Sequence, residues 1–151
     1  MKSAIVVDTS IVIKWVLDEP DSTTALALLT KWINEGTAIY APALLIYEVA
    51  NALYQRVRKA EMTADEAQQA LVDVLFPELE VNFSEYSSLS TRAIELAERY
   101  GLPATYDAHY LALAERNHCE YWTADTRLWN AIAGKINWVR LLGDYSARAA
   151  P

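Results

Sequence analysis

Two aspartates follow apolar runs in the sequence, at positions where carboxylates commonly take part in chemistry. Asp8 comes directly after Ile5-Val6-Val7, and Asp125 comes two residues after Thr123. In an open α/β sheet, ligands bind in the crevice beyond the carboxyl ends of the strands. Helix capping explains each aspartate about as well, because Asp is a preferred N-cap and a helix is predicted after both.

Two further acids lie on predicted helices. At about 100° per residue, Asp107 shares a helix face with Tyr110 and Ala114, so it points toward the core, whereas solvated acids usually lie on the opposite face. Glu48 stands at the edge of the apolar arc that includes Leu45. The simpler explanations are a favourable place in the first helical turn for Asp107 and a boundary side chain with a packed stem for Glu48.

Gathered in one pocket, these four carboxylates would repel one another. Two carboxylates ~4 Å apart repel by roughly 1 kcal/mol in water and ~4 kcal/mol at an effective dielectric constant near 20. The net stability of a domain is only about 5–15 kcal/mol, so raised pKa values or bound cations must relieve the repulsion. Hard divalent ions, Mg²⁺ or Mn²⁺, suit an all-carboxylate pocket.

Other kinds of site find little support. Zinc would require histidine or thiolate ligands, but His118 and Cys119 are adjacent in a predicted loop without a partner pair at ligand spacing. His109 lies about 200° around its helix from Asp107, so we expect it to face away from the acids. No glycine-rich phosphate loop is present, and we expect no nucleotide cofactor.

Short apolar runs alternate with longer helical periods, which predicts βαβ units around a parallel sheet. We expect a three-layer α/β/α fold with about five strands. Predicted strands cover residues 4–7, 38–40, 79–83, 121–123 and 138–140. Predicted helices cover residues 11–17, 22–34, 43–59, 84–100, 104–116 and 125–133, and a capping box at Thr63 and Glu66 opens one more that ends before Pro77.

Length and composition limit the classes of protein. The 151 residues, 53% of them hydrophobic, predict a single domain over residues 1–145 with a frayed tail over 146–151. One cysteine excludes an internal disulfide, and no apolar run is long enough to span a membrane. We expect a cytoplasmic protein. The net charge of −7 argues against binding nucleic acid mainly by phosphate neutralisation, but an enzyme that reaches phosphates through cations remains open.

Four segments, in this order and spacing, resemble the PIN-domain ribonucleases, most of all the VapC-type toxins. They are Val6-Val7-Asp8-Thr9-Ser10, Leu45-Ile46-Tyr47-Glu48-Val49-Ala50-Asn51-Ala52-Leu53, Thr105-Tyr106-Asp107-Ala108-His109-Tyr110-Leu111-Ala112-Leu113-Ala114 and Trp122-Thr123-Ala124-Asp125. The likeness extends from Ile5 to about Leu142. The resemblance implies a Mg²⁺- or Mn²⁺-dependent endoribonuclease, usually a homodimer, that a cognate antitoxin inhibits.

Carried over by the resemblance, Asp8, Glu48, Asp107 and Asp125 would be the catalytic, metal-binding acids. Ser10 and Thr123 match hydroxyl positions often found beside such acids, although capping of the following helices explains them about as well. The basic cluster Arg56, Arg58 and Lys59 is a candidate contact for RNA or for an acidic antitoxin segment. Its simpler explanation is a helix C-terminus that favours cations.

Three other functions would require different residues or leave the acids without a role. A receiver-like signalling module would require an acidic pair after the first strand, where Asp8 stands alone. A haloacid-dehalogenase-like phosphatase would require a second aspartate at the position of Ser10. A catalytically silent PIN-like scaffold that only binds partners remains as the alternative, and the four acids argue against it.

Overall fold

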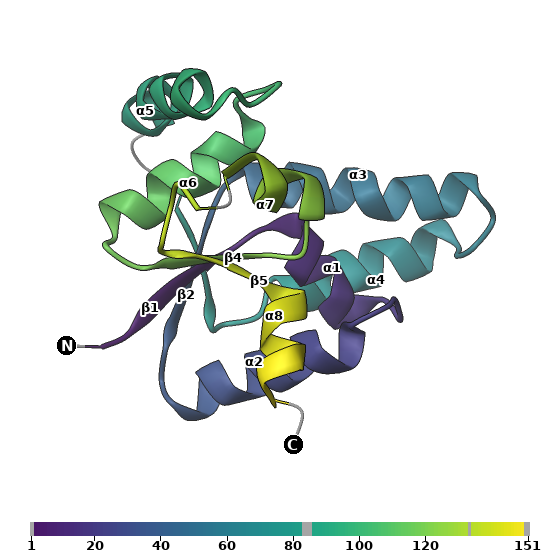
Figure 1. Cartoon of the computed structure of the whole chain (residues 1–151). Helices are drawn as coiled ribbons and strands as arrows, with labels where there is room; N and C mark the ends of the chain where they lie inside the picture. Colours follow the sequence, from purple (N-terminus) through teal and green to yellow (C-terminus); the bar gives the residue numbers. More distant parts are fainter. Residues whose placement is uncertain (1, 83–85, 133, 150–151) are drawn as a thin grey trace.

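Five parallel strands form one sheet, and helices cover both of its faces (Figure 1). The computed structural model describes residues 2–82, 86–132 and 134–149. The strands are β1 (Ala4–Val7), β2 (Ala38–Pro42), β3 (Leu79–Asn82), β4 (Glu120–Thr123) and β5 (Val139–Leu141). Their order in the sheet is β3-β2-β1-β4-β5. The predicted α/β class and five-stranded parallel sheet are confirmed.

The helices form two layers around this sheet and a hairpin at its end. They are α1 (Thr9–Val16), α2 (Ser22–Asn34), α3 (Leu44–Arg58), α4 (Ala64–Val74), α5 (Tyr86–Tyr100), α6 (Tyr106–Arg116), α7 (Thr126–Ile132) and α8 (Leu142–Ala149). One layer has α6 packed on β1, β2 and β4 and covered by α5; the other contains α1, α2 and α8 (Figure 1). The antiparallel pair α3 and α4 projects from one end of the sheet.

The position of β1 determines where a site can form. Its apolar residues are buried, with Val6 and Val7 fully inaccessible, as a central strand covered on both faces requires. The chain leaves β1 toward β2 on one side and returns to β4 on the other, so the strand order reverses there. Val7 is in register with Trp122. The residues that follow β1 and β4 therefore lie next to each other at a topological switch point.

Helix ends follow the signals in the sequence. The Thr63 side chain accepts a hydrogen bond from the Glu66 backbone N–H, and the Glu66 carboxylate accepts one from the Thr63 N–H, so the predicted capping box is present. Gly36 and Gly101, which follow α2 and α5, have φ values of 66° and 64°. Such left-handed conformations favour glycine and end a helix. No helix in the described ranges is both long and apolar enough to cross a membrane.

Some boundaries differ from the sequence-based prediction. Helix α1 begins at Thr9 rather than at residue 11, because the Asp8 side chain caps it from the preceding position. Helix α8 follows β5 directly and was not predicted. The predicted fraying of residues 146–151 stays a prediction. The predicted end of one strand at Phe83 and the predicted start of the following helix at Ser84 lie outside the described residues.

Candidate active site

Asp8 lies at the carboxyl end of β1 and is 5% exposed. Its Oδ1 atom accepts hydrogen bonds from the backbone N–H groups of Ser10 and Ile11, at 3.0 and 3.4 Å, and so caps α1. The Oδ2 atom accepts from the hydroxyls of Tyr121 and Thr123, each at 2.6 Å. Capping and a polar site are thus not alternatives for this residue, because each carboxylate oxygen has a separate set of donors.

The two predicted hydroxyls connect Asp8 to the segment that carries Asp125. The Ser10 hydroxyl donates to Asp8 Oδ1 at 2.5 Å and accepts from the Ala124 N–H at 2.8 Å. Thr123 Oγ1 accepts from the Asp125 N–H at 3.1 Å while it donates to Asp8. These hydroxyls fix the relative position of the segments that follow β1 and β4.

Glu48 reaches the same edge of the sheet from α3. Its Oε1 atom accepts a hydrogen bond from the Tyr110 hydroxyl at 2.6 Å and a longer one from Thr9 Oγ1 at 3.5 Å. The Tyr110 ring stacks on the Tyr121 ring, with centroids 5.9 Å apart and planes at 12°. Two buried tyrosines in contact therefore hold two acids, Tyr110 for Glu48 and Tyr121 for Asp8.

The remaining two acids are less constrained. Asp125 Oδ1 accepts from the N–H groups of Arg127 and Leu128 at 2.9 and 3.4 Å and caps α7. Asp107, in the first turn of α6, has no hydrogen-bond or ion-pair partner among the described residues. In the described part of the chain, the carboxylate oxygens of this group without a hydrogen bond are those of Asp107, Oδ2 of Asp125 and Oε2 of Glu48, and they stay available to a ligand.

The electrostatics show that the four acids lie within reach of one another. Burial, and after it the charges of Asp8, Asp125 and Glu48, raise the pKa of Asp107 to about 6, against the lowering effect of Arg127. Burial also raises the pKa of Asp8, against the effect of its hydrogen bonds. The pKa of Glu48 rises through burial and through the charge of Asp8. The structure thus brings all four predicted acids together, and like charges destabilise their ionised forms.

The donor set fits a hard divalent cation. Carboxylate oxygens at one sheet edge, with raised pKa values, are what a cation such as Mg²⁺ or Mn²⁺ would stabilise. In the ranges that the structure describes, however, no three Asp, Glu, His or Cys side chains are arranged so that they could hold a metal ion. The four acids thus form a cluster that a cation would have to draw closer, not a preformed cage.

The predicted basic cluster lies apart from the acids. Eight residues along α3 separate Arg56 from Glu48, a rise of about 12 Å. Arg56 forms ion pairs with Glu19 and Glu61, while Arg58 and Lys59 are exposed. A contact of this cluster with RNA or with an antitoxin stays a prediction.

The ring nitrogens of His109 have partners on α5 and at the start of its own helix. Its imidazole lies 3.0 Å from the Ser90 hydroxyl through Nε2 and 2.6 Å from the Thr105 carbonyl oxygen through Nδ1. Its charge opposes the rise in the pKa of Glu48 that burial causes. His109 thus lies within electrostatic range of Glu48, while both of its ring nitrogens are directed to other partners, so the prediction that it faces away from the acids stays a prediction.

Tyr110 and Tyr121 contact the site acids, although the sequence pattern does not predict them as site residues. Both rings are buried, 1% and 0% exposed, and an aromatic residue on an apolar face is usually core. One signal was present, because Tyr121 and Thr123 alternate along one strand and so share a face. Both of their hydroxyls reach Asp8.

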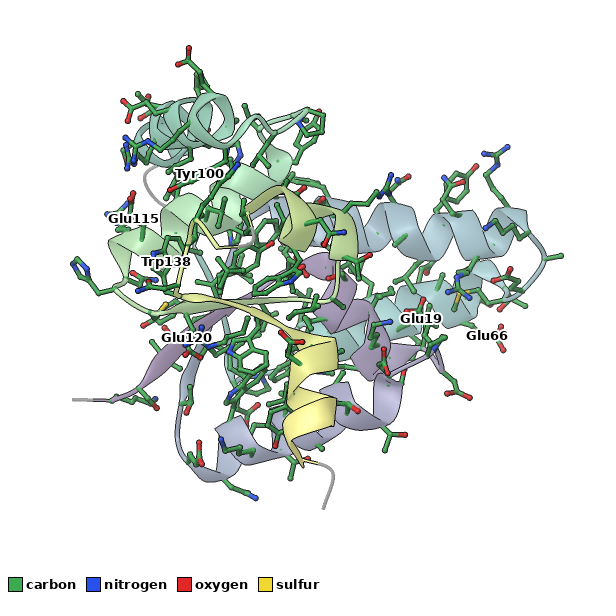
Figure 2. All side chains as sticks on the ribbon, in the orientation of Figure 1. Glu19, Glu66, Tyr100, Glu115, Glu120 and Trp138 are labelled. Carbon is green, nitrogen blue, oxygen red and sulfur yellow. The ribbon has the colours of Figure 1, made fainter. Side chains whose placement is uncertain are left out.

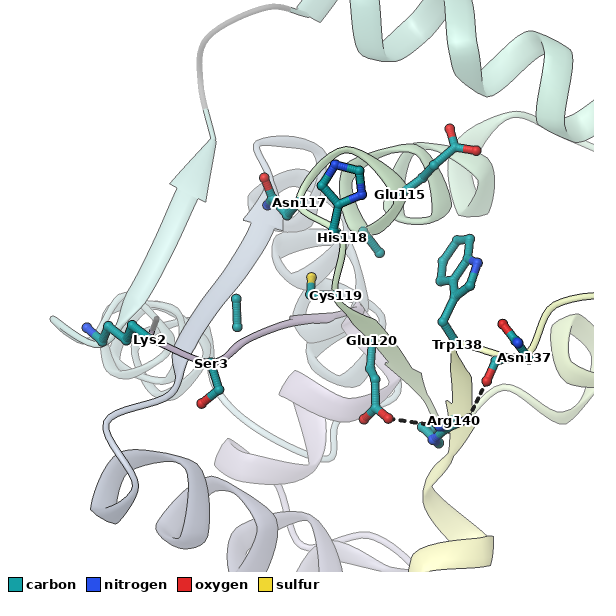
Figure 3. A pocket seen from close by; sticks show the side chains of 12 residues that line it. Lys2, Ser3, Glu115, Asn117, His118, Cys119, Glu120, Asn137, Trp138 and Arg140 are labelled. Atoms are coloured by element: carbon teal, nitrogen blue, oxygen red, sulfur yellow. Dashed lines mark hydrogen bonds and ion pairs between the residues drawn. The ribbon is translucent and has the colours of Figure 1, made fainter.

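A large hollow lies elsewhere, at the amino ends of the strands. It has a volume of about 800 Å³, and its walls include His118, Cys119, Trp138 and the ion pair between Glu120 and Arg140 (Figure 3). Figure 2 shows Glu115 and Glu120 on this side of the molecule and Glu19 on the opposite side, beside α4. None of the four acids lines this hollow.

Comparisons with known proteins find a matching family model, a related sequence and structures with a similar fold. The family model described as PIN domain matches residues 5–135. A relative named Ribonuclease VapC3, from Pyrobaculum aerophilum, is 30% identical over 126 residues, which cover 82% of this chain and 91% of the relative. A crystal structure of a Pyrobaculum aerophilum protein has a TM-score of 0.64 at 28% identity and covers 97% of this chain and 99% of its own. A toxin–antitoxin complex from Klebsiella pneumoniae has a TM-score of 0.62 at 20% identity, with coverage of 91% and 97%.

Proposed function

The chain belongs to the PIN domain family, and on that premise we propose that it is a divalent-metal-dependent endoribonuclease, the toxin of a toxin–antitoxin pair. The observation that carries the proposal is the position of Asp107. Three other carboxylates raise its pKa, together with burial, and it has no cation in contact within the described ranges. A relative that shares 30% identity is named a ribonuclease, which supports RNA as the substrate.

In this proposal Asp8, Glu48, Asp107 and Asp125 hold Mg²⁺ or Mn²⁺. Such an ion, when bound, supplies the Lewis acidity that activates water and stabilises negative charge on the phosphate. Among the described residues, Asp107, Oδ2 of Asp125 and Oε2 of Glu48 offer oxygens without hydrogen bonds. Tyr121 and Thr123 fix the orientation of Asp8, and Tyr110 fixes that of Glu48. Such supporting hydrogen bonds orient ligands and tune their basicity.

The partners of the proposal are an RNA substrate, a cognate antitoxin and a second copy of the chain. One structural neighbour is a toxin–antitoxin complex, which supports an antitoxin partner. Large apolar side chains are exposed on the α3–α4 hairpin, with Tyr54 57%, Val72 62% and Leu75 47% exposed, and they suit a protein interface. We place the protein in the cytoplasm, where its RNA substrates are.

The proposal is tested by incubating the purified chain with a mixed-sequence RNA in the presence of Mg²⁺, Mn²⁺ or a chelator. We expect cleavage with either ion, none with the chelator, and none with Asp107→Asn. Glu120→Gln, which removes a carboxylate at the other end of the sheet, serves as the matched control and should cleave normally. A parent chain that cleaves no RNA with either ion, and binds Mn²⁺ only weakly, would replace the proposal with the silent scaffold.

A further inference from the structure

A small apolar hollow lies beside the acidic cluster, and the proposed chemistry does not use it. Its volume is about 180 Å³. Its walls come from the start of α3, from α5 and from the start of α6, and include Leu44, Tyr47, Leu89, Tyr106 and His109. It thus lies where two of the acid-bearing helices begin.

Two tyrosines of this hollow are unusually exposed. Tyr47 is 69% and Tyr106 is 60% exposed, whereas Leu89 behind them is 5% exposed. Each tyrosine directly precedes an acid of the cluster, Tyr47 before Glu48 and Tyr106 before Asp107. Consecutive residues of a helix point about 100° apart, so each acid lies on the face adjacent to its tyrosine. His109, which also lines the hollow, acts on the pKa of Glu48, so a group bound between these rings lies within electrostatic range of the acids.

The wall formed by His109 is held rigidly. One ring nitrogen lies at hydrogen-bond distance from Ser90 Oγ and the other from the carbonyl oxygen of Thr105. With both nitrogens occupied, the imidazole offers its ring surface rather than a polar atom to the hollow. The hollow thus presents mainly apolar and aromatic surface, which suits a flat, uncharged group.

The charges around the hollow indicate which flat, uncharged group it binds. The acids repel phosphate, Arg127 is the cation that acts on Asp107, and the basic cluster lies at the far end of α3. With a net charge of −7, affinity for RNA must come largely from contacts other than phosphate neutralisation. Stacking of bases on aromatic side chains is such a contact, and it works on unpaired nucleotides.

We infer that this hollow is a nucleobase pocket, in which Tyr47 and Tyr106 stack on a base of single-stranded RNA next to the phosphate that is cleaved. The inference rests on the proposed ribonuclease function and deepens it, because it makes RNA with an unpaired base at that position the preferred substrate. A protein interface instead requires about 800 Å² per partner, whereas this hollow fits one planar group.

The first test is the kinetics of cleavage of a short, unstructured RNA by Tyr47→Ala and Tyr106→Ala. We expect KM to rise roughly five-fold to a hundred-fold, the range that corresponds to the loss of one base stack, with a much smaller change in kcat. Tyr47→Phe keeps the ring and should recover most of the loss. Leu26→Ala is the control, because Leu26 is an exposed apolar side chain on α2, outside the hollow and the hairpin. Equal KM values for parent and both alanine variants would overturn the inference.

The second test uses RNAs with a single abasic site placed in turn at each position around the cleaved bond. At one position the abasic RNA should raise KM for the parent, and Tyr47→Ala should then add little further. If the abasic site and Tyr47→Ala raised KM independently, so that their effects multiplied at every position of the RNA, the pocket would be refuted. So would a change of Tyr47→Ala from dimer to monomer in sedimentation, because a second copy would then cover the hollow.

A third measurement separates this inference from the proposed function. Binding of the same RNA is measured by fluorescence anisotropy with Asp107→Asn, with and without Tyr47→Ala. A weaker complex for the double variant supports the pocket even if the parent chain cleaves nothing. Equal binding overturns the pocket while Mg²⁺-dependent cleavage by the parent still supports the nuclease.

Discussion

The two ends of the parallel sheet hold acidic residues in opposite electrostatic situations. At the amino ends of the strands, Glu120 forms an ion pair with Arg140 at 2.9 Å, and nearby Glu115 pairs with Arg92 at 2.7 Å. At the carboxyl ends, the donors to Asp8 are hydroxyls and backbone amides. One end has its charges paired, and the other accumulates them.

The difference shows that charge, rather than size, marks the candidate site. The larger hollow is at the amino end, where Arg92 lowers the pKa of Glu115. At the carboxyl end, burial and neighbouring carboxylates raise the pKa of Asp107 to about 6. The cluster destabilises the ionised carboxylates, and a folded domain is only marginally stable. A ligand that neutralises their charge offsets this cost, so the arrangement indicates a ligand-binding site.

The largest expected effect is the loss of activity in Asp8→Asn. We expect Mg²⁺-dependent RNA cleavage to fall more than about a hundred-fold, beyond what the loss of a residue supporting a ligand costs. The fold should remain, because asparagine also caps helices well. Rates and circular dichroism of Asp8→Asn and of the amino-end control Glu120→Gln test this. If both variants lost RNA cleavage to the same extent, the two ends of the sheet would not differ in function.

Tyr121→Phe should have the next largest effect. It removes the hydroxyl that donates to Asp8 and keeps the stack on Tyr110. We expect apparent Mn²⁺ affinity, measured from the metal dependence of the rate, to fall about 10- to 100-fold. Tyr40→Phe is the control, because Tyr40 bonds to Glu80 away from the cluster. The role of Tyr121 would be refuted by an unchanged metal dependence.

Without metal, the acidic cluster should make stability fall with rising pH. The folded-state pKa of Asp107, about 6, exceeds its ordinary value of 3.8. Its favourable contribution is therefore complete below pH 3.8 and is lost as pH rises through about 6. The shift corresponds to about 3 kcal/mol at full burial, which solvent screening reduces to about 1 kcal/mol. Urea unfolding should find Asp107→Asn more stable than the parent at pH 7 and equal to it near pH 3.5.

The smallest effect on stability is expected at the amino ends of the strands, where the pH dependence has the opposite sign. Arg92 lowers the pKa of Glu115, so this pair stabilises the fold above the ordinary pKa of glutamate and loses that effect as pH falls. Glu115→Gln should destabilise the protein at pH 7 by about 0.5 kcal/mol, as for an exposed ion pair. The same urea experiment measures it. If Glu115→Gln were more stable than the parent at pH 7, the distinction between paired charges at one end of the sheet and accumulated charges at the other would be contradicted.

The sequence predicts the sheet and the location of the acids because both depend on local signals. Runs such as residues 4–7 are apolar throughout, and Asp8 and Asp125 stand just after strands, where ligands bind in this class of fold. Tyr121 is not predicted by such local signals. Its buried ring resembles a core residue, and Asp8, which accepts its hydrogen bond, lies 113 residues away in the sequence. His109 is comparable, because its proximity to Glu48 depends on how α3 and α6 pack.

The strand order has a consequence for the synthesis of this chain on the ribosome. β1 is made first but lies between β2 and β4, and β4 is made more than 110 residues later. Asp8 gains the Tyr121 and Thr123 hydroxyls, and the acid set gains Asp125, only after that stretch has emerged. An unfinished polypeptide therefore lacks a complete set of acids until β4 and Asp125 have been made.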